Sequence, residues 1–560
     1  MQHSGRRVGP LQKTTHELWY AWVGLFLLAS LFRLTGPAWD GGIAAHPDER
    51  FLLGVGHQVR LVENICAAVP DYAYGHLPFA LLRLLVLIAP DADPLYAARL
   101  LSGLIGVLIV ALAGRCAKEI LGSRDNEVLS LLAGAVACTA PFLIQQSHFF
   151  TVDPLGTVLA SGALLAGCRR RWRTAGVLTG LAVATKLSLI LTAVVLVAWV
   201  YWCEHAAARD VQASRRRRHG VPVAPLRVSL FAILGFALVS PWSFITPVAC
   251  WRGPVIQGLM AGGRLDFPYT RQYAGTLPWI YPLEQMALWG LGPAATAMGL
   301  VGILMTLRPY SSQHGAGRAA LSLPWVWTVL AFLVLGGLKV KFPRYLLPIY
   351  PWWAGWAAAA FGRLSRRVGV LAWSVLLAVT LGGTAFLGVA QAALYSRPHP
   401  WVEASDWIYR RVQPGARLAV EAWDHPLPVP RPGGDPTDYG QLTLPVYDPE
   451  GPEKMATLQA IVADVDAVIL ASRRGYAANP SPSTLTWYRG LLRAQQIHVF
   501  ARCPTLGPLA ITDDPFADAG LPVGVTLAKR CGTRYVLRLP ALDESFRVYD
   551  APMTLVMDRR

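Results

Sequence analysis

The segment AAHPDERFLLGVGHQVR, residues 44–60, follows the first long apolar run of the chain. It places two adjacent carboxylates, Asp48 and Glu49, where a chain that leaves a membrane would meet water. The apolar run before it, Leu18 to Leu34, is long enough to cross a bilayer and follows several basic residues. No small-residue cleavage site comes after this run, so we expect an uncleaved first span rather than a signal peptide.

The composition is that of a membrane protein with many spans. Of the 560 residues, 54% are hydrophobic and only 15% are charged, and the mean hydropathy is +0.38. These values lie outside the usual balance of a soluble globular domain. The net charge of +17 does not indicate nucleic-acid binding, because the Arg and Lys clusters fall between apolar runs and lack interleaved aromatic residues.

Ten further apolar runs predict, with the first, a polytopic α-helical protein of about eleven transmembrane helices. They cover residues 95–114, 128–147, 154–168, 174–187, 189–203, 226–246, 283–306, 323–338, 345–361 and 369–393. If the N-terminus lies inside, every basic cluster between spans falls on the cytoplasmic side, as the positive-inside bias requires. This count requires that the short run 77–89, which carries Arg83, does not cross. Residues 37–93 are therefore expected to form one large outer loop that contains amphipathic helices.

The composition and the hydrophobic pattern of the sequence change from Arg397 onward. Pro and Gly become dense, and short strand-like runs alternate with amphipathic helical stretches. We therefore expect a transmembrane domain over 1–394 and an extracytoplasmic α/β domain over 395–560. Cys503 and Cys531 lie in the second domain and fit either a disulfide or two unpaired thiols. The eight cysteines show no zinc-like spacing, so no metal site is predicted.

Two carboxylates share the predicted outer boundary of the membrane. Asp48 follows the first span, and Asp153 lies at the mouth of the fourth. Burial among apolar groups disfavours the charged form of a carboxylate, which makes it a better base. The alternatives are a solvated loop for Asp48 and Glu49, and a carboxylate at a helix N-terminus for Asp153.

Cations gather at the same boundary, namely Lys186, Arg271, Lys341 and Arg344. Charges at a membrane boundary usually have a partner. Because few outer carboxylates are available, a phosphate-bearing ligand suits these side chains. The alternatives are snorkelling of Lys186 to the interface and anchoring of Lys341 and Arg344 to lipid headgroups.

In this order, these residues resemble the GT-C membrane glycosyltransferases. Within that class the chain is most similar to the protein O-mannosyltransferase and aminoarabinose-transferase superfamily, which is bacterial glycosyltransferase family 39-like and phospholipid carrier-dependent. The likeness rests on the outer Asp-Glu pair, the later outer Asp, and four segments. These segments are GLAVATK (180–186), YTRQYAGTLPWIYPLEQMALWGLG (269–292), KFPRYLLPIYP (341–351) and DESFRVYDAP (543–552).

The resemblance implies a sugar donor on a polyprenyl phosphate, attacked at the outer face with inversion at the anomeric carbon. It assigns catalytic roles to Asp48, Glu49 and Asp153. It implies donor-side roles for Lys186, Lys341, Arg344 and Tyr345, and we add His46, His76, Arg271 and Tyr273 as further substrate-binding candidates. One departure concerns YAYGHLPFA (72–80), where His76 stands in place of the acidic-basic pair of the aminoarabinose transferases. The sugar and the acceptor, whether lipid, glycan or protein, therefore stay open.

A phosphodiester-linked sugar has a leaving group that is already stabilised as an anion. One base therefore suffices, whereas a glycosidase needs a pair of carboxyl groups. Asp48 is expected to take the proton from the acceptor hydroxyl, while the cations stabilise the phosphate. No cofactor is required, although a divalent cation is compatible with this chemistry.

Two other functional classes remain open for a chain of the inner (plasma) membrane with these features. Boundary charges also line the pathway of a transporter or scrambler of lipid-linked sugars. A non-catalytic scaffold for envelope assembly is the second alternative.

Overall fold

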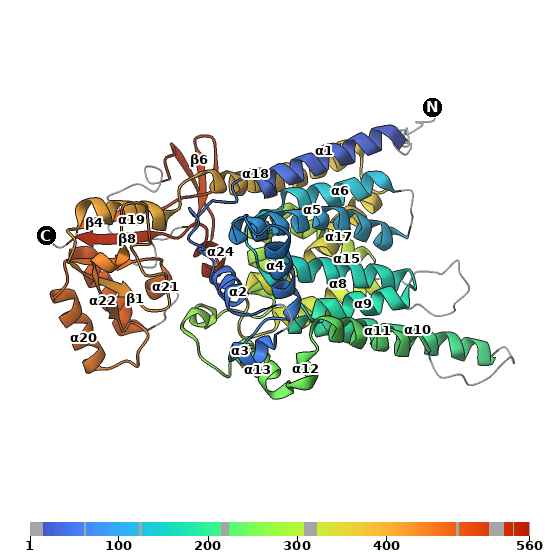
Figure 1. Ribbon diagram of the computed structural model, residues 1–560. Coiled ribbons are helices and arrows are strands. Elements are labelled where there is room, and N and C mark those ends of the chain that lie inside the picture. Colours follow the sequence, from blue (N-terminus) through green and yellow to red (C-terminus); the bar gives the residue numbers. More distant parts are fainter. Residues whose placement is uncertain are drawn as a thin grey trace, which may run out of the picture.

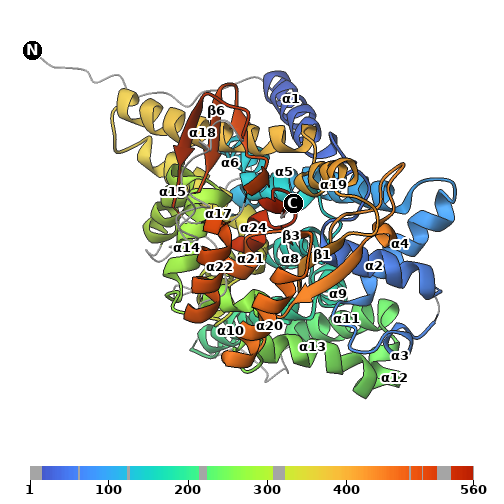
Figure 2. The ribbon, with the colours of Figure 1, turned by 90° about the vertical axis from the view of Figure 1, so that its left-hand side faces the viewer.

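The computed structural model describes residues 15–558, except for 61–62, 123–125, 214–222, 307–321, 478–480, 495, 514–530 and 541. A bundle of helices forms the larger part, and a smaller part that contains β-sheets covers one end of it (Figure 1). Figure 2 looks onto the bundle through this covering part.

Within the described ranges, four helical stretches are long and apolar enough to cross a membrane. They are His16–Leu34 in α1 (Thr15–Leu34), α5 (Pro94–Leu121), Leu187–His205 at the start of α10 (Ile190–Ala213), and Val370–Arg411, which begins with α18 (Val370–Ala392). A fifth results if α6 (Glu127–Thr139) and α7 (Pro141–Ser147) are one span bent by 63°. The membrane character of the chain is confirmed, but the prediction of about eleven full spans is not.

The other predicted spans are shorter or interrupted helices. They include α8 (Val152–Cys168), α9 (Trp172–Val183), α11 (Val223–Val239), α15 (Pro293–Met305), α16 (Leu323–Gly336) and α17 (Tyr350–Leu364). The predicted span 283–306 contains the end of α14 (Ile280–Gln285), a π-helical turn at η3 (Met286–Gly290), and α15. Pro343 and Pro348 lie in the 3₁₀ helix η4 (Pro343–Ile349), which precedes α17. Proline lacks a backbone N–H, and it therefore interrupts helices that hydrophobicity alone would draw as continuous.

Helix α17 is the buried centre of the bundle. Trp352, Trp353 and Trp356 are fully buried there. Helix α15 approaches through Gly302, where an added Cβ would lie only 2.0 Å from the carbonyl oxygen of Trp356. Small residues at such crossings allow close helix packing inside a membrane.

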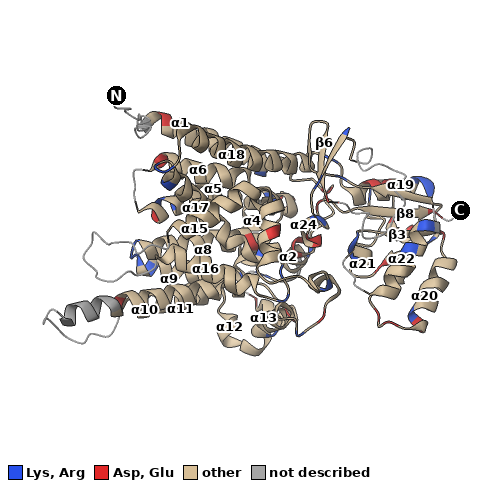
Figure 3. Ribbon diagram, turned by 180° about the vertical axis from the view of Figure 1, so that it is seen from behind, with Lys and Arg blue, Asp and Glu red and all other residues tan. Residues whose placement is uncertain are grey.

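The predicted outer loop 37–93 contains α2 (Pro47–Gln58), α3 (Ile65–Ala68) and α4 (His76–Ile88). These helices lie towards the end of the bundle that also carries α12 (Trp242–Ile245), α13 (Pro247–Ala261) and the sheet-containing part (Figure 1). Figure 3 shows Lys and Arg at the opposite ends of the helices, and a second group of charges at the junction. This distribution is the one that the positive-inside argument predicts for a membrane helix bundle.

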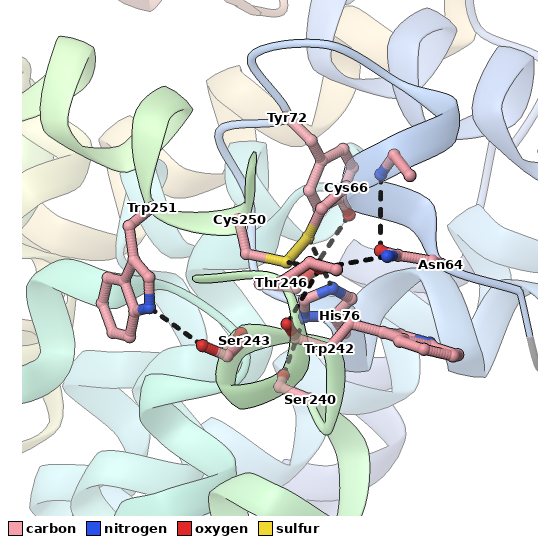
Figure 4. Close-up of a disulfide and its surroundings, with 12 residues drawn as sticks. Asn64, Cys66, Tyr72, His76, Ser240, Trp242, Ser243, Thr246, Cys250 and Trp251 are labelled. Carbon is pink, nitrogen blue, oxygen red and sulfur yellow. Dashed lines mark hydrogen bonds between the residues drawn. A yellow bond between two sulfur atoms is a disulfide. The ribbon is translucent and has the colours of Figure 1, made fainter. Parts of the chain in front are cut away.

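A disulfide between Cys66 of α3 and Cys250 of α13 joins two of the segments at this end of the bundle (Figure 4). Beside it, Asn64 donates a 3.0 Å hydrogen bond to the hydroxyl oxygen of Thr246. No spacing in the sequence predicts this pairing. Of the two alternatives for Cys503 and Cys531, the structure contains the disulfide.

A five-stranded sheet with the order β2-β1-β3-β8-β4 forms the core of the C-terminal part. Strand β1 pairs in parallel with β2 and β3, whereas β8 is antiparallel to β3 and β4. The five strands are β1 (Arg417–Glu421), β2 (Gly440–Leu444), β3 (Ala467–Leu470), β4 (Gln496–Phe500) and β8 (Thr554–Asp558). Helices packed around them include α19 (Pro400–Arg411), α20 (Pro452–Ala463), α21 (Arg474–Ala477) and α22 (Pro482–Ala494). A second sheet contains β5 (Thr505–Leu506), β6 (Leu509–Thr512) and β7 (Tyr535–Arg538).

Residues 542–551, which include α24 (Glu544–Arg547), tie the C-terminal part to the bundle; we call them the docking segment. The Asp543 carboxylate accepts a 2.7 Å hydrogen bond from the Tyr281 hydroxyl. Asp550 accepts one of 2.8 Å from Tyr395 in η5 (Ala393–Ser396). Gln145 of α7 also donates a 3.1 Å hydrogen bond to Asp550, so the docking segment contacts residues from both halves of the bundle sequence. The predicted domain boundary at 394/395 falls inside η5.

Candidate active site

Asp48 lies in the first turn of α2, which begins with Pro47. Pro is favoured at this first helical position. The His46 ring caps the helix, because its Nδ1 accepts a 3.2 Å hydrogen bond from the Asp48 backbone N–H. Burial lowers the pKa of His46 to about 3, so the ring is neutral and able to accept this bond. The cap thereby fixes the start of α2 at the junction with the C-terminal part.

The Asp48 carboxylate has two side-chain partners, Arg344 of η4 and Tyr74, which precedes α4. Arg344 Nη1 lies 2.9 Å from Asp48 Oδ2. The Tyr74 hydroxyl also hydrogen-bonds to this carboxylate. Burial acts to raise the pKa of Asp48, but Arg344 and the other neighbours more than offset it, and the pKa lies below the ordinary value. Asp48 is therefore an ionised, weak base in this state of the site, whereas its position in the sequence predicts a carboxylate with a raised pKa.

A second ion pair lies close to the first. Asp153 lies in the first turn of α8, and its Oδ1 lies 2.6 Å from the Nζ of Lys186, which follows α9. The Lys186 ammonium also lies 4.9 Å from the centre of the Tyr345 ring. Asp48 is within electrostatic reach of Lys186, and Arg344 within reach of Asp153. We call Asp48, Asp153, Lys186 and Arg344 the charge quartet.

A close backbone contact positions the two halves of the charge quartet. The backbone N–H of Gly75 donates a 3.1 Å hydrogen bond to the carbonyl oxygen of Thr185, next to Lys186. An added Cβ at Gly75 would lie 2.0 Å from the carbonyl oxygen of Ala184, so only glycine fits there. The predicted outer loop 37–93, which carries Tyr74, is thus fixed against the end of α9.

A narrow cleft of about 10 Å³ opens beside the Asp153–Lys186 pair. Polar side chains line one part of the cleft, and apolar side chains line the rest. The lining residues are Asp153, Lys186, Ser188, Leu189, Leu191, Trp327, Leu335, Tyr345 and Pro348. Asp153 Oδ2 is buried without a hydrogen-bond partner in the described part of the chain. The chemistry of this lining, rather than the volume of the cleft, suits a ligand with a charged, hydroxyl-bearing head and an apolar tail, and such a ligand requires the cleft to widen.

Glu49 faces away from the charge quartet. Its carboxylate binds the Arg99 guanidinium at 2.7 Å and accepts a 2.8 Å hydrogen bond from the Phe150 backbone N–H. Arg99 also pairs with Asp40 at 2.6 Å, and all three charged side chains are buried. Neighbouring helix residues point about 100° apart, which explains why Asp48 and Glu49 take different partners. The geometry gives Glu49 a supporting position beneath α2.

Four other predicted site residues have partners outside the charge quartet. Arg271 pairs with Asp266 at 2.9 Å, and the Tyr273 hydroxyl lies 3.4 Å from the docking segment at Asp543. Lys341 Nζ donates hydrogen bonds of 3.0 Å to Thr276 Oγ1 and to the Lys339 carbonyl oxygen. Nδ1 of His76 lies 2.8 Å from the Ser240 hydroxyl oxygen, and Nε2 lies 3.3 Å from Cys66 Sγ (Figure 4). None of these contacts, as described, reaches the charge quartet.

Sequence reasoning missed two tyrosines of the site. Tyr74 binds Asp48, and the Tyr549 ring of the docking segment lies 4.3 Å from the His46 ring, centre to centre. Both occur in quoted segments, YAYGHLPFA and DESFRVYDAP, but no periodicity placed them beside α2. The C-terminal part thus contributes a side chain to the surroundings of Asp48.

One group of three potential metal ligands was found among the described residues, namely Cys66, His76 and Cys250. Both sulfur atoms of this group form the disulfide, which leaves no thiolate for a metal. The group includes no carboxylate of the charge quartet.

Comparison with known proteins yields structural likenesses more than sequence relatives. No known family's profile matches the chain. A stretch of 58 residues is 34% identical to a UPF0060 membrane protein of Dechloromonas aromatica (strain RCB), which covers 10% of this chain and 52% of that protein. The chain thus spans about half the length of this curated relative.

Three solved structures are similar over most of the chain. ArnT from Cupriavidus metallidurans, bound to undecaprenyl phosphate, has a TM-score of 0.50 and a sequence identity of 15%. The similarity covers 87% of this chain and 96% of ArnT. The Archaeoglobus fulgidus oligosaccharyltransferase, tethered with an acceptor peptide, has a TM-score of 0.47 and a sequence identity of 13%. The similarity covers 88% of this chain and 73% of the oligosaccharyltransferase. Mycobacterial arabinofuranosyltransferase AftD has a TM-score of 0.40 and a sequence identity of 16%. The similarity covers 98% of this chain and 40% of AftD. The likeness to ArnT confirms the predicted fold: the chain has the GT-C fold of membrane glycosyltransferases.

Proposed function

We propose that the protein transfers a sugar from a polyprenyl-phosphate donor to an acceptor hydroxyl at the outer face of the plasma membrane, with inversion. The observation that carries this proposal is the Asp48–Arg344 ion pair, which stands beside a second carboxylate–cation pair and a largely apolar cleft. The charged end of the cleft suits a sugar phosphate, and its apolar lining suits the first units of a polyprenyl chain. The fold agrees with this activity, and the ArnT structure itself contains undecaprenyl phosphate.

The ion pairs explain how donor binding would activate the base. A donor phosphate competes with Asp48 for Arg344 and with Asp153 for Lys186, because both cations bind phosphate well. Once Arg344 turns to the phosphate, which is itself an anion, the pKa of Asp48 rises. Asp48 is therefore a poor base without the donor and a better one with it.

The chemical step then balances with one base. Asp48 takes the proton from the acceptor hydroxyl as that oxygen bonds to the anomeric carbon from the face opposite the phosphate. The bond between the anomeric carbon and the phosphate oxygen breaks, and its electron pair leaves on polyprenyl phosphate. Arg344 and Lys186 stabilise the charge on this leaving group. Asp153, with a buried oxygen that has no partner, is placed to hold a hydroxyl of the sugar.

Two features support an outer location of the site and of the C-terminal domain, residues 395–560. The Cys66–Cys250 disulfide links two segments at the same end of the bundle as the charge quartet, and disulfides persist in oxidising compartments. Basic residues gather at the other end, as on the cytoplasmic side of membrane proteins.

The proposed enzyme is tested by following both products in reconstituted vesicles. The purified chain is supplied with polyprenyl-phosphate hexoses and pentoses, and with envelope extracts of a strain that lacks the protein. We expect release of polyprenyl phosphate in step with sugar incorporation into one acceptor fraction, which mass spectrometry identifies. Movement of intact lipid-linked sugar between leaflets without release would instead show a transporter or scrambler.

A further inference from the structure

A groove of about 300 Å³, separate from the proposed donor cleft, lies where the first outer loop meets η5 and the C-terminal domain. Its lining includes Trp39, which follows α1, and Tyr395 and Ser396, which follow α18. It therefore stands at the outer ends of two helices that are long and apolar enough to cross a membrane.

These two helices expose much of their apolar surface. Within their spanning windows only 17% of α1 and 11% of the α18 stretch is buried in the protein. Leu31, close to the groove in sequence, is exposed by 56%. In a membrane these surfaces contact acyl chains, so the groove lies at the level of lipid headgroups.

The lining of the groove is positively charged. It contains Arg397 and Arg431 and no carboxylate among its described residues. The Arg397 side chain donates only to a neutral acceptor, the Cys531 carbonyl oxygen at 2.9 Å, and forms no ion pair within the described ranges. Arg431 uses Nε for Asp406 at 3.1 Å, while its Nη1 points to the groove beside Gly41, 3.3 Å from where a Cβ would stand.

A third arginine, Arg502, lies behind the lining of the groove and contacts two of its residues. The buried Arg502 guanidinium lies 5.4 Å from the Trp39 ring centre and donates to the carbonyl oxygens of Trp39 and Arg397. Its Nη2 is buried without a hydrogen-bond partner among the residues that the structure describes. Of these three arginines, Arg397 forms no ion pair within the described ranges and is therefore the one most open to an external anion.

We propose that this groove binds the headgroup phosphate of an anionic phospholipid of the outer leaflet. Arginine forks suit phosphate oxygens, and the acyl chains would lie along the exposed faces of α1 and α18. Trp39 connects the groove to the site, because Arg99 lies 4.6 Å from its ring centre and binds Glu49. A bound lipid would therefore stabilise the position of α2, which carries Asp48. This lipid site does not depend on the proposed sugar transfer.

The test measures lipid retention by the intact chain. Purified protein is equilibrated with phosphatidylglycerol or phosphatidylcholine, and the bound lipid is counted by native mass spectrometry. We expect preferential retention of phosphatidylglycerol, and a loss of at least about tenfold in Arg397→Ala/Arg431→Ala, since two charge-assisted contacts disappear. The matched control Arg410→Ala/Arg411→Ala removes the same charge from exposed positions of α19 and should retain lipid as the parent does.

A second variant guards against a general effect of the arginine changes on folding. Ser396→Trp fills the groove but keeps both arginines, and it should also lose the lipid. Unchanged retention in both groove variants, or an equal loss in the Arg410/Arg411 control, would overturn the proposal. Displacement of the lipid by excess inorganic phosphate would show a site for free anions and would overturn it as well.

Discussion

The Arg344 guanidinium donates a 2.9 Å hydrogen bond to the Asp48 carboxylate, although 296 positions separate the two residues in the chain. Asp48 comes from α2 in the outer loop, and Arg344 from η4 before the central helix α17. Either charge would be costly if it were buried alone. An incoming phosphate can take the place of the carboxylate on Arg344, which is why this pair is central to the proposed function.

Loss of Arg344 should weaken donor binding more than loss of Lys341. Arg344→Ala removes a charge-assisted phosphate contact worth roughly 1.5–3 kcal/mol, which corresponds to about a tenfold or larger rise in the apparent donor constant. Lys341 binds Thr276 instead, so Lys341→Ala should have a smaller effect. Arg344→Lys should recover only part of the loss, because a point charge replaces a bidentate fork. Donor titrations that rank Lys341→Ala above Arg344→Ala would contradict the geometry of the charge quartet.

Glu421 should make the stability of the protein depend on pH. Burial raises the pKa of Glu421 to about 8, against the hydrogen bond from Tyr488. Between its ordinary value of 4.5 and about 8, the folded state keeps a proton that the unfolded chain loses, so stability falls as pH rises. The slope from this group approaches about 1.4 kcal/mol per pH unit. Thermal midpoints from pH 5 to 8 should fall less in Glu421→Gln than in the parent or in the exposed control Glu453→Gln; parallel curves for all three would refute the assignment.

The sequence was sufficient for the broad architecture and for the members of the charge quartet. Charge and hydropathy patterns predict a membrane bundle with a strand-containing C-terminal part, because both follow from the chemistry of single segments. Asp48, Asp153, Lys186 and Arg344 were identified because charges at a membrane boundary need partners. The structure brings these four together with Tyr345.

Other features depend on tertiary contacts that no local pattern contains. The orientation of Glu49 towards Arg99 follows from how α2 packs on α5, and the approach of Tyr549 to His46 follows from docking of the C-terminal domain. The predicted count of about eleven spans is not confirmed, because several apolar runs form helices that are short or bent, such as α6 and α7 with the break before Pro141. The Cys66–Cys250 pair is separated by 184 residues, beyond any spacing rule.

The Cys66–Cys250 disulfide should stabilise the outer end of the bundle. Closing so long a loop restricts the unfolded chain, and loss of a disulfide typically costs about 2–5 kcal/mol. Cys66→Ser/Cys250→Ser should therefore lower the thermal midpoint, whereas Cys203→Ser, which removes a free thiol, should not. Alkylation without reductant should leave Cys66 and Cys250 unmodified in mass spectra. Full alkylation of both thiols in protein from intact cells would show that the pair is reduced.

The orientation of the chain is testable by cysteine labelling in intact cells. Arg60→Cys, Leu265→Cys and Glu450→Cys should react with an impermeant reagent added outside, because their positions share the end of the bundle with the charge quartet. Arg366→Cys, an exposed position in a basic cluster after α17, should react only after permeabilisation. Labelling of Arg366→Cys from outside would reverse the orientation.

The most direct test of the proposed mechanism is the single-turnover rate of Asp48→Asn with saturating polyprenyl-phosphate sugar and acceptor. We predict a rate about 10²–10⁴-fold below that of the parent, the loss expected for removal of a general base. Donor binding should be kept, because Arg344 no longer has a competing carboxylate. Asp71→Asn, which changes an exposed aspartate of the same outer loop, should react at the parental rate. A parental rate in Asp48→Asn would contradict the assignment of Asp48 as the base.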